Sequence, residues 1–278
     1  ADAGMKEFII DDGWQDSYGD WGTDMKKFPN GLKPVFDYIK SLGMKPGLWV
    51  SIGSATPDSK VYKAHPEWFV LDKEGKHTSL HAPNDTEKFT ACFGTGWYDY
   101  IKDILLKLAV DYGLEYFKLD FAVVTGAYSY DHTQSGCYST NHPGHKDHNE
   151  SLYTNYERLW QLFDELHEAK PELFIDCTFE TLGGTQLIDY ALVQHAEGDW
   201  LSNFAGFAGE KTDLRIRNMA WWRSPAMPAT ALVIGNPQMQ DPGWETHIQS
   251  IAGALPIMLG DPRKLSAGDL KIYRGYAD

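Results

Sequence analysis

Two strand-like segments of the sequence end in carboxylates that could take part in chemistry. The segment Tyr-Phe-Lys-Leu-Asp ends in Asp120, and Glu-Phe-Ile-Ile-Asp-Asp-Gly-Trp carries Asp11 and Asp12 where its apolar run stops. Because side chains alternate along a strand, Lys118 and Asp120 are expected to point into one shared site. A lysine in that position lowers the pKa of its neighbour and keeps Asp120 ionised as a nucleophile. Carboxylates at the C-terminal ends of strands indicate an enzyme built on a (β/α) barrel.

The elements that must hold these residues alternate between strands and helices. Strands are predicted at 7–11, 44–50, 115–120, 173–178, 190–195, 229–234 and 254–259, and amphipathic helices at 32–42, 98–112, 153–169 and 213–223. This alternation predicts a parallel sheet with crossover helices, and the near-continuous apolar runs fit strands buried on both faces. An open doubly wound sheet is disfavoured, because a glycine-rich phosphate loop would then follow the first strand, and Asp-Asp-Gly-Trp is not one.

The strand count bears on the domain organisation. Seven strands are predicted, whereas a closed barrel has eight. The sequence begins almost at once with a strand, so we expect residues 1–278 to be one catalytic barrel from a longer multidomain chain, with the first barrel strand upstream of residue 1. An open barrel exposes two unpaired strand edges, which favours association or instability. Residues 125–150 lack apolar periodicity and follow Asp120, where a long loop usually shapes a substrate pocket.

Composition excludes some partners and favours others. The formal net charge of −14 and the pI near 5.1 argue against nucleic acid and anionic membranes, which bind basic surfaces. The ten tryptophans and the 14% aromatic share mildly favour a carbohydrate ligand, because aromatic faces stack on sugar rings. The three cysteines have no paired spacing, so no disulfide framework is expected. No membrane span and no signal peptide are expected within this sequence. The localisation stays open, because we expect the sequence to be part of a longer chain.

Hydrolysis of a glycosidic bond needs two carboxyl groups that flank it. One attacks the anomeric carbon or activates a water, and Asp120 fits this role. The other protonates the leaving oxygen. Asp199, in His-Ala-Glu-Gly-Asp-Trp, follows a predicted strand among apolar and aromatic residues, and partial burial there would raise its pKa and suit it to act as the acid. On spacing alone the competitors for this second role are Glu180, Asp189 and Glu197.

Three histidines recur at three-residue spacing: His142, His145 and His148. Such a cluster is able to bind zinc. However, Pro143 and Gly144 prevent a regular helix from aligning the rings, and the hydrolytic reaction needs no metal. We therefore expect a solvated loop, no metal and no cofactor.

The order of several motifs resembles the α-galactosidase (melibiase) catalytic barrel of glycoside hydrolase family 36, in the clan shared with family 27. The resemblance covers nearly the whole chain. It implies a (β/α)8 barrel and a retaining exo-α-galactosidase that acts on galactose-containing oligosaccharides. The motifs are Asp-Asp-Gly-Trp (11–14), Gly-Asp-Trp (19–21), Lys-Phe-Pro-Asn-Gly-Leu-Lys (27–33), Gly-Met-Lys-Pro-Gly-Leu-Trp (43–49), Ser-Lys-Val-Tyr-Lys-Ala-His-Pro-Glu-Trp (59–68), Lys-Leu-Asp (118–120) and Leu-Gly-Asp-Pro-Arg-Lys-Leu-Ser (259–266).

The resemblance also implies roles for individual residues. Asp120 becomes the nucleophile, with Lys118 touching the sugar, and Asp199 becomes the acid/base. The residues implied to bind the sugar or line its pocket are Asp11, Asp12, Trp49 and Cys177. Of these, Asp11 and Asp12 bind sugar hydroxyls, and Trp49 is interpreted as a platform for the sugar ring in preference to a core residue.

The chain departs from the family pattern at three places. Val50-Ser51-Ile52-Gly53 stands where the family usually has Glu-Pro-Glu, Ala122 replaces a common asparagine, and residues 178–185 alter a glycine-rich turn. Glu180 is expected to replace a lost hydroxyl contact. These changes concern the identity of the sugar and leave an α-N-acetylgalactosaminidase and a galactosyl transglycosylase as alternatives. The truncated barrel leaves a third, an inactive sugar-binding fragment, and the histidine loop a less favoured fourth, a metal-dependent barrel hydrolase.

Overall fold

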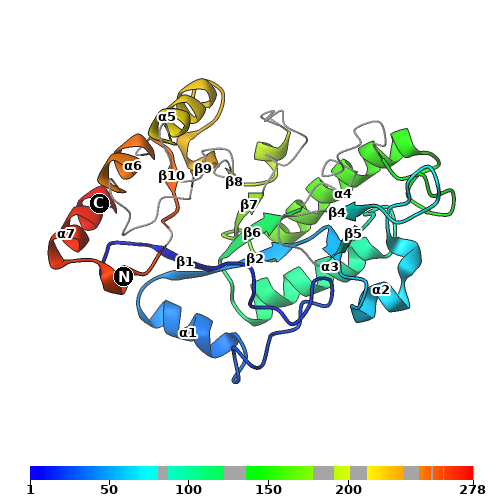
Figure 1. The fold of residues 1–278 in the computed structure, drawn as a ribbon, viewed down its shortest axis with the longest axis horizontal. Coiled ribbons are helices and arrows are strands. Elements are labelled where there is room, and N and C mark those ends of the chain that lie inside the picture. The colour runs from blue at the N-terminus through cyan, green and yellow to red at the C-terminus, as the bar shows by residue number, and fades with distance from the viewer. Residues whose placement is uncertain are drawn as a thin grey trace.

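The computed structural model describes residues 1–80, 87–121, 136–177, 191–200, 212–234, 244–251, 253–258 and 260–277. Their main feature is a curled parallel sheet that forms part of a barrel (Figure 1). Its seven strands lie in the order in which they follow one another along the chain, as expected for a truncated (β/α)8 barrel. They are β1 (Glu7–Ile10), β2 (Lys45–Ser51), β6 (Tyr116–Asp120), β7 (Phe174–Cys177), β8 (Gly198–Trp200), β9 (Leu232–Ile234) and β10 (Leu255–Pro256).

Helices pack outside the sheet (Figure 1), and all but the last, which follows β10, lie in crossovers between its strands. They are α1 (Lys33–Ser41), α3 (Trp97–Leu106, continued by a π-helical turn at Lys107–Asp111), α4 (His148–Ala169), α5 (Thr212–Arg223), α6 (Trp244–Ile251) and α7 (Ala267–Ala277). The start of α4 lies five residues before the predicted position 153. Asp147 explains the earlier start, because its side chain accepts a hydrogen bond from the Glu150 amide at 2.9 Å and caps the helix.

A small antiparallel sheet lies between β2 and α3 and was not predicted. It has the strand order β3-β5-β4, formed by β3 (Ser54–Ala55), β5 (Lys88–Thr90) and β4 (Ser79–Leu80). The short helix α2 (Lys60–Ala64) and a 3-10 turn at Pro66–Trp68 complete this unit. Strands of two or three residues leave too little alternation to be recognised in a sequence.

One predicted strand is wrong. Residues 190–195 were expected to form a strand, but Leu192–Gln194 is a 3-10 turn and the strand β8 begins at Gly198. The close approach of neighbouring strands requires glycine there, because a Cβ at Gly198 would meet Val233 Cγ2 at 2.7 Å and Phe174 Cε1 at 3.0 Å. The apolar run before Gly198 resembles a strand in sequence, whereas the strand itself is only three residues long.

The main hydrophobic core lies between the first part of the sheet and its helices, with fully buried side chains such as Phe36, Leu48, Phe117 and Phe163. A second cluster joins the two ends of the chain. Ala3, Ile248 of α6 and Tyr273 of α7 pack together there, so the segment before β1 contacts the last helices (Figure 1). Among the described helices, none combines the length and the apolar character needed to cross a bilayer.

Candidate active site

The register of the parallel sheet places several polar side chains on one face. Trp49 of β2 pairs with Lys118 of β6, and Lys118 pairs with Asp176 of β7. Paired residues of parallel strands point to the same side of a sheet, so these three share one face. Asp120 lies two residues beyond Lys118 and returns to that face at the C-terminal end of β6. The predicted shared direction of Lys118 and Asp120 therefore agrees with the register.

Two N–H groups hold the carboxylate of Asp120. The Trp49 indole Nε1 donates to Oδ2 at 3.0 Å, and the Phe121 amide donates to Oδ1 at 2.8 Å. Phe121 has a φ of +46°, which is uncommon for a residue other than glycine, and it immediately follows the carboxylate. A backbone in a sparsely populated region next to a reactive group is typical of functional sites, where the surrounding structure maintains it.

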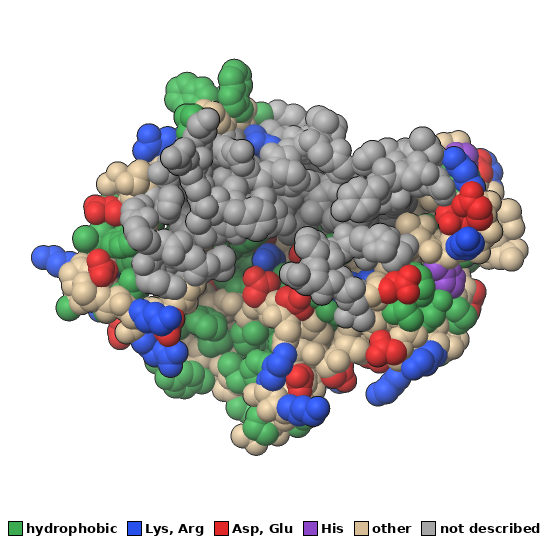
Figure 2. Space-filling view, viewed as in Figure 1, with side chains coloured by type: hydrophobic (Ala, Val, Ile, Leu, Met, Phe, Trp, Pro, Cys, Tyr) green, Lys and Arg blue, Asp and Glu red, His purple; other side chains and the backbone are tan. Residues whose placement is uncertain are grey.

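Lys118 is buried and makes its ion pair with Asp11. The Lys118 Nζ lies 3.0 Å from Asp11 Oδ2, and the same ammonium lies 4.1 Å from the centre of the Trp200 ring. The sequence analysis predicted that Lys118 shares a site with Asp120. The structure adds Asp11 as an ion-pair partner of Lys118. Figure 2 shows acidic side chains and a basic one near the middle of one face of the molecule. Lys118 and Asp11, which belong to strands far apart in sequence, thus form one ion pair at this face of the sheet.

The loop after β1 holds Asp12 away from this pair. Its carboxylate accepts a hydrogen bond from Tyr18 Oη at 2.5 Å and one from Gln15 Nε2 at 2.6 Å. Asp11, in contrast, keeps about half of its side chain exposed, at 51%. No helix begins after the pair, since the next helix is α1 at Lys33, so helix capping does not explain these two acids.

Trp49 and Cys177 lie differently from what was predicted. Trp49 is only 3% exposed and packs edge-on against Tyr18 and Trp21, so it offers its N–H instead of an open ring face. The role of Trp49 as a sugar platform stays a prediction, and the contact that the structure shows for it is the N–H on Asp120. Cys177 is fully buried in the main core and pairs in register with Asp199, one position away from the row of Lys118 and Asp176. It belongs to the core behind the sheet.

Asp199 lies within β8 and is buried, with 4% of its surface exposed. Its neighbour Trp200 is the residue whose ring meets Lys118, so alternation along the strand turns Asp199 to the opposite face of the sheet. On that side lies Arg223 of α5. Burial lowers the pKa of Arg223, and the charge of Asp199 acts in the opposite direction, which shows that the two groups are near each other.

The structure describes only some of the remaining predicted residues in this region. Glu180 and Asp189 lie outside the described residues, and so do residues 122–135, which include the first part of the predicted loop at 125–150. Of the loop predicted at 125–150, residues 136–147 are non-helical and the rest of the described part belongs to α4.

One candidate residue was not recognised in the sequence. Asp176 is fully buried, and burial raises the pKa of its carboxyl to about 7. Its Oδ2 accepts a hydrogen bond from Tyr116 Oη at 2.9 Å, while Oδ1 has no partner among the described residues. The signal was the single acidic residue in the apolar strand Phe-Ile-Asp-Cys, which a prediction based on strand ends passes over.

The expectation of a solvated histidine loop is wrong for two of the three residues. His142 is 7% exposed and His145 is 5% exposed, and both lie against Cys92 and Cys137. His148 begins α4 and is partly buried, with its ring stacked on Tyr138. The cysteines carry no disulfide.

A carboxylate held by two N–H donors at a strand end, beside an acid–lysine pair, is suited to attack an electrophilic carbon while neighbouring groups bind hydroxyls. Comparison with known proteins identifies the family of the chain. The model of the melibiase family matches residues 1–237. The chain belongs to the melibiase family.

Relatives of this melibiase-family chain are longer than it is. Alpha-galactosidase 1 of Pediococcus pentosaceus is 27% identical over 98% of the chain, which corresponds to 36% of that protein. The protein named "A type blood alpha-D-galactosamine galactosaminidase" of Flavonifractor plautii is 33% identical over 43% of the chain and 12% of its own length. The crystal structure of a variant of the GH36 α-galactosidase AgaA from Geobacillus stearothermophilus, in complex with raffinose, superposes with a TM-score of 0.76 at 17% identity. That superposition covers 99% of this chain and 37% of the solved one.

Proposed function

We propose that this chain is the catalytic barrel of a retaining exo-α-galactosidase that removes terminal α-galactosyl residues from oligosaccharides. The observation that carries the proposal is Asp120, held by the N–H groups of Trp49 and Phe121 at the end of β6 in a melibiase-family barrel. Since the chain spans about a third of the Pediococcus relative, the activity of the whole protein belongs to this proposal as well.

In the proposed reaction, Asp120 attacks the anomeric carbon and forms a glycosyl ester as the bond to the leaving oxygen breaks. An acid delivers a proton to that oxygen. The same group, now a base, takes a proton from water as the water oxygen attacks the anomeric carbon. The bond from that carbon to Asp120 breaks, which releases galactose and regenerates the carboxylate. The two N–H donors orient the carboxylate for the first step, and Lys118 beside Asp11 places a positive charge where an oxygen-rich substrate would bind.

Asp11 is the acceptor best placed to bind a sugar hydroxyl, because half of its side chain is exposed beside Lys118. A buried acceptor left unpaired by the wrong epimer costs binding energy, so such a contact discriminates between sugars. Asp12 and Glu180 complete the proposed hydroxyl contacts. The substrate class we propose is a galactose-containing oligosaccharide of the kind bound by the Geobacillus structure, whose ligand is raffinose.

We retain Asp199 as the proposed acid/base, and this role makes a specific demand on β8. Retaining enzymes hold their two carboxyl groups about 5–5.5 Å apart on opposite sides of the scissile bond. In the structure Asp199 lies on the face of β8 opposite Trp200, and its charge raises the pKa of Arg223 against the effect of burial. To act as the acid, it must turn to the face of Trp200, which requires a change in how the three-residue strand β8 pairs with its neighbours.

A second activity has its own support. The Flavonifractor relative is named for action on a galactosamine sugar, so an α-N-acetylgalactosaminidase is the alternative that the comparisons favour. The two activities differ at the substituent on carbon 2. Nitrophenyl α-galactoside and nitrophenyl N-acetyl-α-galactosaminide therefore separate them directly.

The deciding experiment measures hydrolysis of nitrophenyl α-galactoside by the wild type, Asp120→Ala and Asp199→Asn. We expect Asp120→Ala to lose activity by about 10⁴-fold or more and to regain turnover with azide, giving β-galactosyl azide. We expect Asp199→Asn to slow substrates with poor leaving groups more than nitrophenyl substrates, because only the poor leaving groups need a proton.

Asp37→Ala is the matched control, since Asp37 is an exposed carboxylate on α1 that pairs with Lys33. It should retain wild-type activity. An azide product with α configuration would contradict the retaining mechanism. Binding of galactose by calorimetry without turnover of any α-glycoside would identify a sugar-binding fragment in place of an enzyme.

A further inference from the structure

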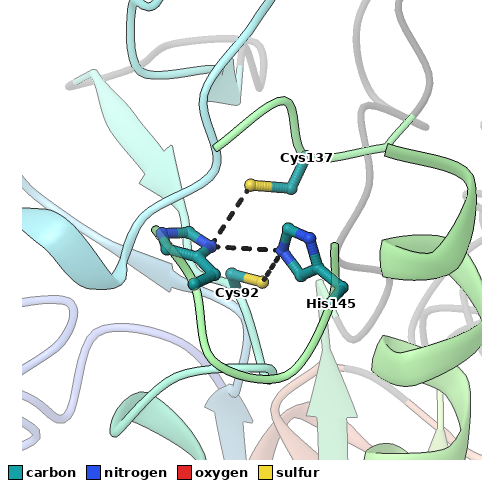
Figure 3. Close-up of side chains that lie close together, drawn as sticks. Cys92, Cys137 and His145 are labelled. Carbon is teal, nitrogen blue, oxygen red and sulfur yellow. Dashed lines mark hydrogen bonds between the residues drawn. The ribbon is translucent and has the colours of Figure 1, made fainter. Parts of the chain in front are cut away.

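We propose that Cys92, Cys137, His142 and His145 form a structural zinc site. The sulfur and nitrogen atoms that these four residues can offer all lie within 4.8 Å of one another. They come from two separate segments, the loop after β5 and the loop before α4. Figure 3 shows Cys92, Cys137 and His145 directed toward one common point between these segments.

Three of the distances between the four atoms match those of a tetrahedral site. With zinc–sulfur bonds of about 2.3 Å and zinc–nitrogen bonds of about 2.0–2.1 Å, a tetrahedron separates sulfur from nitrogen by about 3.6 Å and two nitrogens by about 3.3 Å. Cys92 Sγ lies 3.5 Å from His145 Nε2, and Cys137 Sγ lies 3.4 Å from His142 Nδ1. The two ring nitrogens are 3.3 Å apart.

The surroundings of His142 select the tautomer that binds a metal. Its Nε2 lies 2.7 Å from the carbonyl oxygen of Glu67, which can only accept, so Nε2 carries the proton and donates it. The lone pair of Nδ1 then faces the cluster. This arrangement, in which a ring donates its outer N–H to a backbone carbonyl, is common among metal-binding histidines.

The burial of these four residues also supports a metal site. Both cysteines are fully buried, and neither histidine is more than 7% exposed. Two thiols and two imidazoles turned toward each other form few good hydrogen bonds in an apolar setting, whereas a soft cation satisfies all four at once. His145 Nδ1 has no partner among the described residues.

Two glycines allow the loops to approach closely enough to build the cluster. The Gly144 amide donates to the Gly94 carbonyl at 2.9 Å, and a Cβ at Gly144 would meet Gly94 Cα at 2.5 Å. Gly136 has a φ of +89°, and a Cβ there would collide with the His148 carbonyl. The backbone conformation at Gly136 and the close approach of Gly144 to Gly94 therefore both favour glycine around the cluster.

Four protein ligands fill the coordination shell of zinc and leave no position for a substrate or a reactive water. The site therefore acts on structure. It ties residues 137–145, which precede α4, to Cys92, which follows β5. The metal therefore holds the chain where it approaches α4.

The test is the metal content of the purified chain, produced with zinc in the medium and freed of loosely bound ions by gel filtration. Mass spectrometry of metals should find about one zinc ion per wild-type chain. Cys92→Ser and His145→Ala should lose most of it, while His148→Ala, in the same histidine series but outside the cluster, should keep it. A chelator should lower the unfolding temperature of the wild type and of His148→Ala only.

A second measurement on the wild type covers the case in which the cysteine variants fail to fold. Cobalt that replaces zinc should show the visible bands of a tetrahedral ion with thiolate ligands. The proposal is overturned if a folded, zinc-supplied chain binds no metal, or if zinc content is equal in the ligand variants and the wild type. Protection of Cys92 and Cys137 from alkylation by a mutual disulfide would overturn it too.

Discussion

At the scale of single residues, the indole N–H of Trp49 is the contact on Asp120 that a mutation can remove most cleanly. Trp49→Phe keeps an aromatic ring and deletes the 3.0 Å hydrogen bond to Oδ2. A hydrogen bond to a charged group contributes about 1.5–3 kcal/mol, so kcat on nitrophenyl α-galactoside should fall by about ten- to a hundredfold.

Trp21→Phe is the control for this variant. Trp21 packs against Trp49 in the same aromatic cluster, but its buried indole N–H has no partner among the described residues. It should therefore keep a kcat close to that of the wild type. An equal fall in both variants would show that the cluster acts through packing and not through the hydrogen bond.

Asp176 predicts a pH dependence of stability. Its pKa is raised from 3.8 to about 7 by burial, so between these values the folded state holds a proton that the unfolded state has released. Stability therefore falls as pH rises through this window and stays low above it. Asp176→Asn cannot ionise. The unfolding free energy of this variant minus that of the wild type should therefore be larger at pH 8 than at pH 4, by more than about 1 kcal/mol.

Urea unfolding of both proteins at the two pH values measures this difference. Asp37→Asn, at an exposed site on α1, should show no such change with pH relative to the wild type. A constant difference between Asp176→Asn and the wild type across the range would mean that the carboxyl stays ionised in the folded protein.

At the scale of elements, the sequence predicted the positions of strands correctly where long apolar runs end in acidic residues. β6 and β1 were located in this way, and with them Asp120 and Asp11. β8 was not, because its three residues carry no periodicity and its position depends on the packing of Gly198 against strands that are far away in sequence. The face on which Asp199 lies follows from that register, and a shift by one residue reverses it.

The cysteine–histidine cluster illustrates the same limit. Cys137, His142 and His145 are neighbours in sequence, but Cys92 joins them only through the contact of two loops at Gly94 and Gly144. Spacing along the chain cannot reveal a ligand that tertiary packing delivers. The solvated loop was therefore the reasonable expectation, and burial is the observation that changes it.

At the scale of the whole molecule, the two ends of the chain pack against each other beside the first strand of the sheet. β1 lies at one edge of the sheet and β10 at the other. The residues before β1 contact α6 and α7 through Ala3, Ile248 and Tyr273. Because Asp11 follows β1 directly, we expect the position of its carboxylate to depend on these contacts.

Tyr273→Ala tests this dependence. Tyr273 is 1% exposed and stacks on Trp244 with ring centres 4.3 Å apart, so its truncation should cost about 3 kcal/mol of unfolding free energy. Tyr276→Ala, on the same helix but 42% exposed, should change it by less than about 0.5 kcal/mol. Under conditions where both variants stay folded, Tyr273→Ala should also raise KM for α-galactosides, because loosening of β1 moves Asp11. Equal KM values in the two variants would mean that the contacts between the chain ends stabilise the fold without positioning the site.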